Sequence, residues 1–260
     1  MDELIEIAER AARAAGAVLR QRFAGPRTGV GTKSSATDMV SDADRAAEDA
    51  ILRVILGARP DDAVLGEEGG AREGGSGIRW VVDPLDGTTN FLYGIPQWAV
   101  SIAAEDGAGP AAAVVFDPAR DELFAAARGG GASLNGVPVA VSDATDLSRA
   151  LVTTGFSYRP DERAAAAAIL PEVLPRVRDI RRAGAASLDL AWVACGRADG
   201  YYETLNEWWD VAAGTLLVRE AGGLVEDIPS VGAHGHGTVA AGPGIFAALA
   251  ALVRGAFAKA

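Results

Sequence analysis

The sequence predicts a mixed protein of helices and strands, with an α+β first half and an α/β second half. Two observations indicate this class. Segments with apolar residues at helical spacing occur beside short apolar runs that are bounded by glycine, proline or asparagine. After about Asp143 the pattern changes from consecutive strands to alternating strands and helices. The 260 residues can form one large domain or two modest ones, and either can bury a substantial core.

The first half is expected to open with two helices. Apolar residues recur at helical spacing over residues 2–23, and Gly25-Pro26 ends that pattern. A second helix is expected over residues 42–56. The strands that follow are expected at residues 63–65, 78–82, 97–104, 111–116 and 122–127. The segment 69–77 is rich in glycine and charge, which favours a mobile loop.

In the second half, helices are expected to follow strands. Residues 151–154 have the pattern of a short strand, and a helix is expected over 161–177, where an alanine-rich tract has high helix propensity. The remaining elements are expected as a helix at 187–195, a strand at 200–203 and helices at 211–221 and 245–257. This second part is expected to pack with the first as one unit.

Charge and composition exclude several classes of protein. The net charge of −11 argues against electrostatic binding to nucleic acid, which depends on clustered Lys and Arg. No apolar run reaches the roughly 20 residues that a membrane span requires. The start of the chain is acidic and lacks a secretory signal, and the single cysteine, Cys195, cannot form an internal disulfide. We expect a cytoplasmic protein with no nucleic-acid or membrane partner, while the surplus carboxylate would also suit divalent cations.

The stretch W-V-V-D-P-L-D-G-T-T-N-F, residues 80–91, ends an apolar run with two carboxylates three residues apart. Asp83 is expected at the carboxyl end of a buried strand, where α/β sheets often bind ligands. A tight turn could direct Asp83, Asp86 and the Leu85 carbonyl at one point, and the following hydroxyl and N–H groups could bind phosphate. Such hard oxygen ligands suit Mg²⁺. The alternative is a turn in which Asp86 and Thr88 only cap a helix.

Two further acidic segments favour the metal-site interpretation. Glu67 lies in G-E-E-G-G after another short apolar run, and by itself it would be a solvated turn residue. Asp210 lies at the start of an expected helix, seven residues after Glu203, and by itself it would be a helix N-cap. Together with Asp83, these residues make three acidic clusters in similar positions, which chance would rarely produce.

These motifs resemble those of the inositol monophosphatase family, a branch of the Mg²⁺-dependent, lithium-sensitive sugar-phosphatase superfamily. The resemblance covers nearly the whole chain. Its strongest elements are G-E-E at 66–68, the stretch at 80–91, and Y-Y-E followed by W-D-V-A-A-G within 201–214. In addition, T-K-S-S-A-T-D-M-V-S-D-A-D (32–44) is similar to the mobile metal-associated loop of the family, and A-G-A-A-S-L-D-L (183–190) is similar to its substrate-binding strand-to-helix element.

The resemblance implies a layered α-β-α-β-α sandwich of the inositol monophosphatase and fructose-bisphosphatase type. An N-terminal α+β part, residues 1–143, would carry Glu67 and D-P-L-D-G-T-T-N. A C-terminal α/β part, residues 144–260, would carry Glu203 and Asp210. The active site is expected between the two parts, and a homodimer is also expected.

The resemblance further implies two or three Mg²⁺ ions in each active site. Glu67, Asp83 and the Leu85 carbonyl would bind the first ion. Asp83, Asp86 and Asp210 would bind the second, and Glu67 with waters could hold a weaker third. In such a site one ion lowers the pKa of a water and another stabilises the leaving alkoxide.

Catalytic and substrate-binding roles are implied in the same way. Thr88, paired with Asp44, would orient and deprotonate the water, and Glu67 would assist as a catalytic metal ligand. Backbone N–H groups of Gly87 and Thr88 would hold the phosphate, and Glu203 would accept a hydrogen bond from a substrate hydroxyl. The full set of residues expected to bind the substrate is Gly87, Thr88, Gly184, Ala185, Ala186, Glu203 and Asp210.

Two departures from the family pattern concern the alcohol side of the site. Ala185 stands where some relatives carry a threonine, which removes one polar contact. The segment N-E-W-W-D differs from the more usual K-P-W-D, with Trp208 in the place of proline. Arg181 and Arg182 could bind a second phosphate or could be surface residues.

The expected function is Mg²⁺-dependent hydrolysis of a phosphate monoester of a small polyol, with myo-inositol 1-phosphate as the first candidate and lithium as an inhibitor. The alternative is the same chemistry on histidinol phosphate, a sugar bisphosphate or a 3′-phosphonucleotide. A third hypothesis is a regulatory partner protein that keeps the fold without turnover. The intact pair of Thr88 and Asp44 argues against it, because a binding module needs no water-activating pair.

Overall fold

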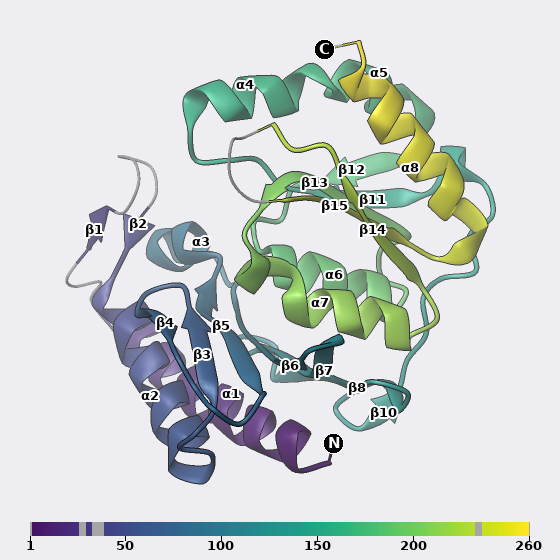
Figure 1. Cartoon of the computed structure of the whole chain (residues 1–260). Coiled ribbons are helices and arrows are strands. Elements are labelled where there is room, and N and C mark those ends of the chain that lie inside the picture. The colour runs from purple at the N-terminus through teal and green to yellow at the C-terminus, as the bar shows by residue number, and fades with distance from the viewer. Residues whose placement is uncertain (1, 26–29, 33–38, 232–235, 260) are drawn as a thin grey trace.

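The computed structural model describes residues 2–25, 30–32, 39–231 and 236–259, and within them helices and sheets alternate in layers (Figure 1). The helices are α1 Asp2–Phe23, α2 Asp42–Ala58, α3 Thr88–Tyr93, α4 Pro160–Ala168, α5 Leu170–Val173, α6 Ala186–Ala194, α7 Trp208–Glu220 and α8 Pro243–Phe257, with 3₁₀ turns η1 Leu147–Arg149 and η2 Leu174–Arg176. The strands are β1 Gly31–Thr32, β2 Met39–Val40, β3 Ala63–Gly66, β4 Gly70–Arg72, β5 Arg79–Asp86, β6 Ala99–Asp106, β7 Gly109–Asp117, β8 Glu122–Ala127, β9 Gly131–Leu134, β10 Val137–Pro138, β11 Leu151–Thr154, β12 Asp179–Arg181, β13 Gly200–Asn206, β14 Leu224–Ile228 and β15 His236–Ala241.

Two sheets form the framework of the described part of the chain. The first has the strand order β10-β9-β8-β7-β6-β5-β3-β4 and is antiparallel except for the parallel pair of β3 and β5. The second has the order β12-β11-β13-β15-β14, in which β11 runs parallel to both β12 and β13. Parallel neighbours bring their carboxyl ends to the same edge of a sheet, which is where the acidic residues were expected to meet.

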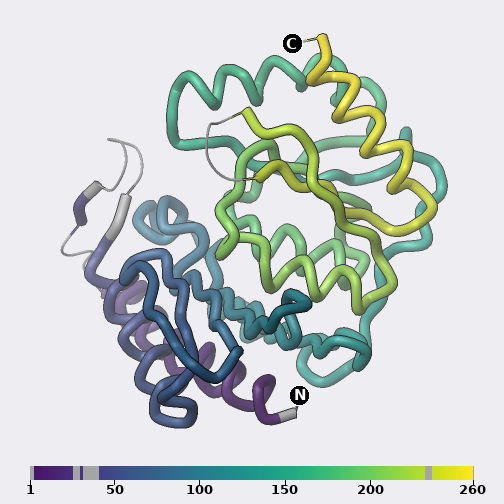
Figure 2. The backbone as a smooth tube through the Cα atoms, in the orientation of Figure 1, coloured from purple at the N-terminus to yellow at the C-terminus, as the bar shows by residue number. Residues whose placement is uncertain are grey.

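The layers follow from the apolar faces of the sheets. Helices α1 and α2 cover one face of the first sheet, α6 and α7 lie between the two sheets, and α8 covers the outer face of the second (Figures 1 and 2). Trp80 and Val82 of β5 pack toward α1 and α2, whereas Val81 packs toward α6 and α7. Tyr201 and Tyr202 of β13 divide in the same way between the α6–α7 layer and the α8 layer. The predicted α-β-α-β-α sandwich is confirmed.

The prediction of a single helix over residues 161–177 is wrong. The chain forms α4, α5 and η2 there instead. Pro171 and Pro175 lie in the first turns of α5 and η2, where proline is tolerated, but each would remove a hydrogen bond and clash inside a continuous helix. The alanine-rich tract is helical as expected, so the two prolines set where the helical segments end.

Other differences concern strands. The segment 69–77, expected to be a mobile loop, contains β4, and Arg72 in it donates to the Pro60 carbonyl at 2.8 Å. Strands β9, β10, β12, β14 and β15 are not predicted, because they are short or rich in small and charged residues. None of the helices in the described ranges is long and apolar enough to cross a membrane. The division of the chain at residue 143 stays a prediction.

The contact between α6 and α7 gives a test of the central layer. A methyl group at Gly214 of α7 would come within 2.5 Å of Leu190 Cβ in α6. We expect Gly214→Ala to lower the free energy of unfolding by about 1–3 kcal/mol, although alanine is the better helix former by about 1 kcal/mol. Urea denaturation measures the change.

Gly255→Ala in α8 is the matched control. Gly255 is exposed, and no described atom lies within 4 Å of the position its Cβ would take. This change should raise the free energy of unfolding by up to about 1 kcal/mol. Stabilisation by Gly214→Ala would contradict the close packing of α6 against α7.

Candidate active site

The predicted metal and substrate residues line two adjoining cavities. The smaller cavity, of about 60 Å³, is lined by Glu67, Asp83, Leu85, Asp86, Gly87, Thr88, Tyr158 and Asp210. The larger cavity, of about 90 Å³, shares Asp86, Tyr158 and Asp210 and is also lined by Gly155, Phe156, Arg182, Gly184, Ala185, Ala186, Asp189, Glu203 and Asn206. Residues that are far apart in the sequence are therefore neighbours here, while their roles stay predictions.

Parallel pairing of β3 and β5 places Glu67 beside Asp83. Gly66 at the end of β3 pairs with Val82, and the N–H of Glu67 donates to the Val82 carbonyl at 3.1 Å. The next residue of β5 is Asp83, so the two carboxylates occur at the same edge of the first sheet. This is the position expected for carboxylates that follow neighbouring buried strands.

A buried glutamate that the sequence does not single out, Glu48 of α2, supports the turn that carries Glu67. Backbone N–H groups of Gly69 and Glu68 donate to its carboxylate, while burial raises the pKa of Glu48 above its usual range. A side chain at Gly66 would overlap with the Glu48 carboxylate. A larger residue at the end of β3 would displace this carboxylate, so Gly66 allows the contact by which Glu48 positions the turn.

A β-bulge in β5 puts Asp83 and Asp86 on the same face of the sheet. Against β6, Asp83 pairs with Ser101 and Asp86 pairs with Ala99, so three steps along β5 match two steps along β6. In a regular strand, residues three apart point to opposite faces. The irregularity coincides with Pro84, which has no N–H to donate to the neighbouring strand. The spacing D-P-L-D therefore delivers two carboxylates to one cavity.

Backbone N–H groups orient both of these carboxylates. Asp83 Oδ1 accepts from the N–H of Leu85 at 2.9 Å. Asp86 Oδ2 accepts from the N–H of Ser187 at 2.7 Å and from the Ser187 hydroxyl at 2.5 Å. The second contact joins β5 to the start of α6, so Asp86 also fixes the position of the larger cavity relative to the smaller one.

Capping boxes at two helix N-termini hold Asp44 and Asp210. The N–H and the hydroxyl of Ser41, the N-cap of α2, donate to Asp44 Oδ2 at 2.8 and 2.6 Å. The N–H of Glu207, the N-cap of α7, donates to Asp210 Oδ2 at 2.8 Å. Asp210 is therefore not the N-cap that its position alone suggested, but the third helical residue, which reaches back to the cap.

The Thr88 hydroxyl lies between two acceptors at the start of α3. It is 2.9 Å from Asp44 Oδ1 and 2.9 Å from the Leu85 carbonyl oxygen, so its one proton can go to either. Gly87 before it has a φ of 91°, and a Cβ there would come within 2.8 Å of the Gln97 carbonyl oxygen. Only glycine adopts this conformation in this space without strain. The predicted pairing of Thr88 with Asp44 is thus present as a direct hydrogen bond.

Burial and mutual repulsion disfavour the charged forms of the acids in the smaller cavity. Burial raises the pKa of Asp83 well above its usual range, and the charge of Glu67 raises it further. Burial also raises the pKa of Asp86, although hydrogen bonds from Ser187 oppose this. The pKa of Asp210 is raised well above its usual range, mainly by burial. No Lys or Arg is among the described residues that line this cavity, so a cation would relieve the repulsion.

The donor set fits Mg²⁺. Four carboxylates and a carbonyl oxygen line one small cavity, and Mg²⁺ prefers hard oxygen ligands. As the described residues stand, no three His, Cys, Asp or Glu side chains are grouped so that they could hold a metal ion by themselves. Water and substrate oxygens would therefore have to complete the coordination. This is usual for Mg²⁺, which keeps several waters and binds only one or two carboxylates in most sites.

Glu203 enters the larger cavity from β13. Against β15, Glu203 pairs with Thr238 and Asn206 pairs with His236, so a second bulge puts Glu203 and Asn206 on the same face. The Tyr201 hydroxyl donates to Glu203 Oε2 at 3.0 Å. Burial nevertheless raises the pKa of Glu203 to about 7. Strand β13 continues beyond the expected end at residue 203, and Asn206 in this extension also lines the cavity.

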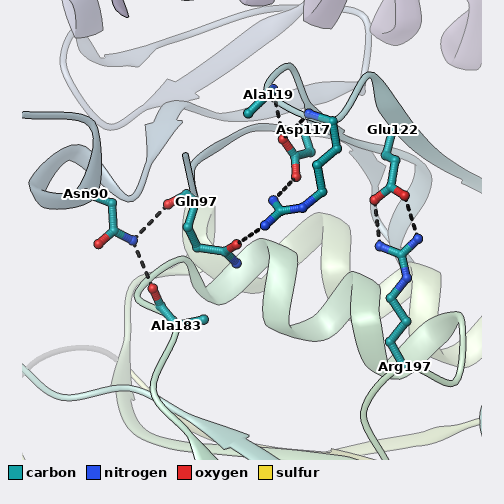
Figure 3. A network of polar contacts seen from close by, with 8 residues as sticks. Asn90, Gln97, Asp117, Ala119, Glu122, Ala183 and Arg197 are labelled. Atoms are coloured by element: carbon teal, nitrogen blue, oxygen red, sulfur yellow. Dashed lines mark hydrogen bonds and ion pairs between the residues drawn. The ribbon is translucent and has the colours of Figure 1, made fainter. Parts of the chain in front are cut away.

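The side-chain amide of Asn90 in α3 joins the segment before β6 to the segment before α6 (Figure 3). The amide donates to the Gln97 carbonyl at 2.8 Å and to the Ala183 carbonyl at 2.9 Å. Arg120 donates to the Gln97 side chain at 2.9 Å and pairs with Asp117 at 2.5 Å. The chain after residue 183, which lines the larger cavity, is thereby fixed against the start of α3.

Several residues at the site are missing from the set selected by sequence. Tyr158 lines both cavities, and its pKa is raised by burial. Asp189 and Asn206 line the larger cavity. The only signal for Asp189 is a lone acidic residue inside an apolar helical pattern. Arg182 also lines the larger cavity, whereas Arg181 pairs with Asp179 at 2.6 Å. Residues 33–38 of the expected metal-associated loop lie outside the described residues.

Comparison with known proteins identifies the family. Residues 1–256 match the model of the inositol monophosphatase family. A protein named Nus factor SuhB from Xylella fastidiosa is 48% identical over 224 residues, covering 86% of this chain and 81% of that protein. The protein of the same name from Escherichia coli K12 is 41% identical over 260 residues, covering 98% of this chain and 97% of that one.

Solved structures agree with this assignment. The extragenic suppressor protein suhB from Bartonella henselae superposes with a TM-score of 0.89 at 39% identity, covering 97% of this chain and 98% of that one. The Thermotoga maritima IMPase superposes with a TM-score of 0.88 at 30% identity, covering 100% of this chain and 99% of that one. The chain therefore belongs to the inositol monophosphatase family, whose members are generally Mg²⁺-dependent.

The raised pKa of Glu203 gives a prediction about pH and stability. Because its pKa is about 7 in the folded chain and 4.5 ordinarily, the folded chain holds this proton more tightly than the unfolded chain. The resulting stabilisation is complete below about pH 4.5 and is lost as pH rises through 7. Glu203→Gln removes this dependence, so the variant should nearly equal wild type near pH 4 and exceed it by roughly 2 kcal/mol near pH 8, after discounting for partial exposure.

Urea denaturation at both pH values, with a chelator present, measures the difference. Exposed Glu73 provides the control, and Glu73→Gln should leave the difference between the two pH values unchanged. If Glu203→Gln and wild type have the same free energy of unfolding at both pH values, burial of the charged Glu203 carboxylate does not destabilise the folded chain, which contradicts the prediction.

Proposed function

We propose that this chain is a Mg²⁺-dependent phosphatase that hydrolyses a phosphate monoester of a small polyol, with myo-inositol 1-phosphate as the first substrate to test. The observation that carries the proposal is the smaller cavity. It combines four carboxylates with a threonine hydroxyl that is hydrogen-bonded to a buried aspartate. Membership of the inositol monophosphatase family supports the same reaction.

Glu67, Asp83, Asp86, Asp210 and the Leu85 carbonyl would hold the ions. Bound Mg²⁺ would supply the positive charge that makes a water more acidic and stabilises the oxygen of the leaving alcohol. The chain orients these ligands before any ion binds, because backbone N–H groups already fix Asp83, Asp86 and Asp210. Less reorganisation is then required when charge develops in the transition state.

Thr88 and Asp44 would move the proton of the attacking water. A water that donates to Thr88 Oγ1 can pass its proton to this oxygen, while the Thr88 proton moves to Asp44 Oδ1 at 2.9 Å. Asp44 is fully buried, and Ser41 holds its other oxygen at 2.6 Å, so the acceptor cannot turn away. The Gly87 and Thr88 N–H groups, in the first turn of α3, are the proposed phosphate donors.

The larger cavity would receive the alcohol. Glu203 is the proposed acceptor of a substrate hydroxyl, and Gly184, Ala185 and Ala186 line the same cavity. A side chain at Gly155 would overlap with the Glu203 carboxylate, so the glycine keeps this part of the cavity open. The same machinery on histidinol phosphate, a sugar bisphosphate or a 3′-phosphonucleotide is the alternative, and Arg182 is the residue that could bind a second phosphate.

A second candidate function is a regulatory partner protein. The observation in its favour is the name Nus factor SuhB, which relatives 41–48% identical to this chain carry. The hydrogen-bonded pair of Thr88 and Asp44 favours an enzyme, because binding alone requires no proton acceptor behind the hydroxyl. Turnover of a panel of phosphate monoesters by the purified chain with Mg²⁺ separates the two functions.

Replacement of Asp83 tests the metal site. Asp83→Asn keeps the size of the side chain and removes the charge that is proposed to bridge two ions. We expect turnover to fall by roughly 10³-fold, which is about 4 kcal/mol of transition-state stabilisation. The thermal unfolding midpoint without Mg²⁺ should stay the same or rise, because repulsion with Glu67 is relieved, and the upward shift caused by Mg²⁺ should disappear.

Asp62→Asn is the control for loss of a buried carboxylate. Asp62 is 1% exposed and binds Arg59 and Trp80, away from both cavities. This variant should be less stable than wild type but should keep its turnover and its response to Mg²⁺. Near wild-type turnover by Asp83→Asn at saturating Mg²⁺ would refute the assignment of Asp83.

A further inference from the structure

Asp189 of α6 has an oxygen that the protein does not satisfy. Its side chain lines the larger cavity, and the residue is 1% exposed. Within the described residues, Asp189 Oδ1 has no hydrogen-bond partner. A buried carboxylate oxygen without a partner destabilises the folded chain, so this oxygen does not itself contribute to stability. A polar ligand in the cavity would provide a partner.

The neighbouring wall repeats this feature. Asn206 is 2% exposed, and its Nδ2 donates to the Tyr201 hydroxyl at 2.9 Å, which in turn donates to Glu203. Because Asn206 uses its Nδ2 as the donor in this series of hydrogen bonds, its Oδ1 remains an acceptor. This oxygen also has no partner among the described residues. The bulge in β13 puts Asn206 and Glu203 on the same face, so Asp189 does not stand alone.

These atoms define the chemistry of the ligand. Asp189 Oδ1 and Asn206 Oδ1 can accept hydrogen bonds, and Glu203 lines the same cavity. A ligand that satisfies them must bring donors on more than one of its atoms. Several hydroxyls on adjacent carbons meet this need, whereas the ring of an aryl ester or a simple alkyl chain does not.

We propose that Asp189 is a specificity-determining residue that accepts a hydrogen bond from a second hydroxyl of the substrate alcohol, distinct from the hydroxyl bound by Glu203. This inference rests on the proposed phosphatase function. The substrate is then the phosphate of a polyol with at least two free hydroxyls near the ester, and phosphates of monohydric alcohols are poor substrates. The unsatisfied oxygen is retained because binding uses it, at the expense of stability.

Kinetics with matched substrates test the role of Asp189. Wild type, Asp189→Ala and Asp189→Asn are compared on myo-inositol 1-phosphate, on its monodeoxy analogues and on an aryl phosphate. For Asp189→Ala we expect kcat/KM on the parent to fall roughly 10- to 100-fold, as for a buried polar group of the substrate that is left without its hydrogen-bond partner. The loss should be less than about 3-fold on the aryl phosphate and on one monodeoxy analogue. That analogue should differ from the one on which Glu203→Gln has no effect.

Thermal unfolding separates this role from a structural one. If folding does not use the Asp189 carboxylate, the unfolding midpoint of Asp189→Asn should equal or exceed that of wild type, whereas Asp62→Asn should unfold at a lower temperature. The proposal is overturned by an equal loss of kcat/KM on all substrates or by no loss on the parent. An equal loss together with a lowered midpoint of Asp189→Asn would indicate a structural role for Asp189.

Failure of the proposed function has a different signature. If wild type hydrolyses none of the esters, the phosphatase assignment is wrong, and calorimetric titration of myo-inositol 1-phosphate in the presence of Mg²⁺ then decides the role of Asp189. Weaker binding to Asp189→Ala than to wild type supports the proposal. Equal affinities, or no binding to wild type, overturn it.

Discussion

The structure depends on holding several carboxylates close together in a cavity whose described lining contains no Lys or Arg. Asp83, Asp86 and Asp210 line one small cavity, and burial raises the pKa of each. Each accepts a hydrogen bond from a backbone N–H, as does Asp44 behind them. Backbone donors fix orientation and offset part of the cost of burial, but they leave the repulsion in place. The described lining of this cavity therefore holds an excess of negative charge that a bound cation would balance.

The same local device builds both cavities. In β5 and in β13, two polar residues three positions apart face the same side because a bulge adds one residue between them. A regular strand would place one member of each pair on the far face, inside the apolar core. Each bulge therefore places the side-chain oxygens of two polar residues in the same cavity. The packing of α6 and α7 between the sheets then brings the two cavities together, through Ser187 and Asn90.

The sequence predicts the metal side of the site better than the alcohol side, for a physical reason. Asp83 and Glu67 directly follow apolar strands, so the local sequence pattern is sufficient to predict their position at a sheet edge. Asp189 lies within an apolar helical segment, and nothing local shows which cavity it faces. Strands such as β14 and β15 are likewise set by pairing between distant segments. Pro171 is a different case. Proline is disfavoured inside a helix, so the sequence itself indicates a break there, but the alanine-rich pattern before it favours one continuous helix.

The central claim is that the oriented carboxylates form a divalent-cation site. The most direct measurement is a crystal structure of the chain grown with Mn²⁺ in place of Mg²⁺, with ion positions taken from anomalous scattering. We expect at least two peaks in the smaller cavity, about 2.0–2.6 Å from oxygens of Glu67, Asp83, Asp86 or Asp210. Well-ordered carboxylates with no anomalous peak between them, or peaks only elsewhere on the molecule, would contradict it.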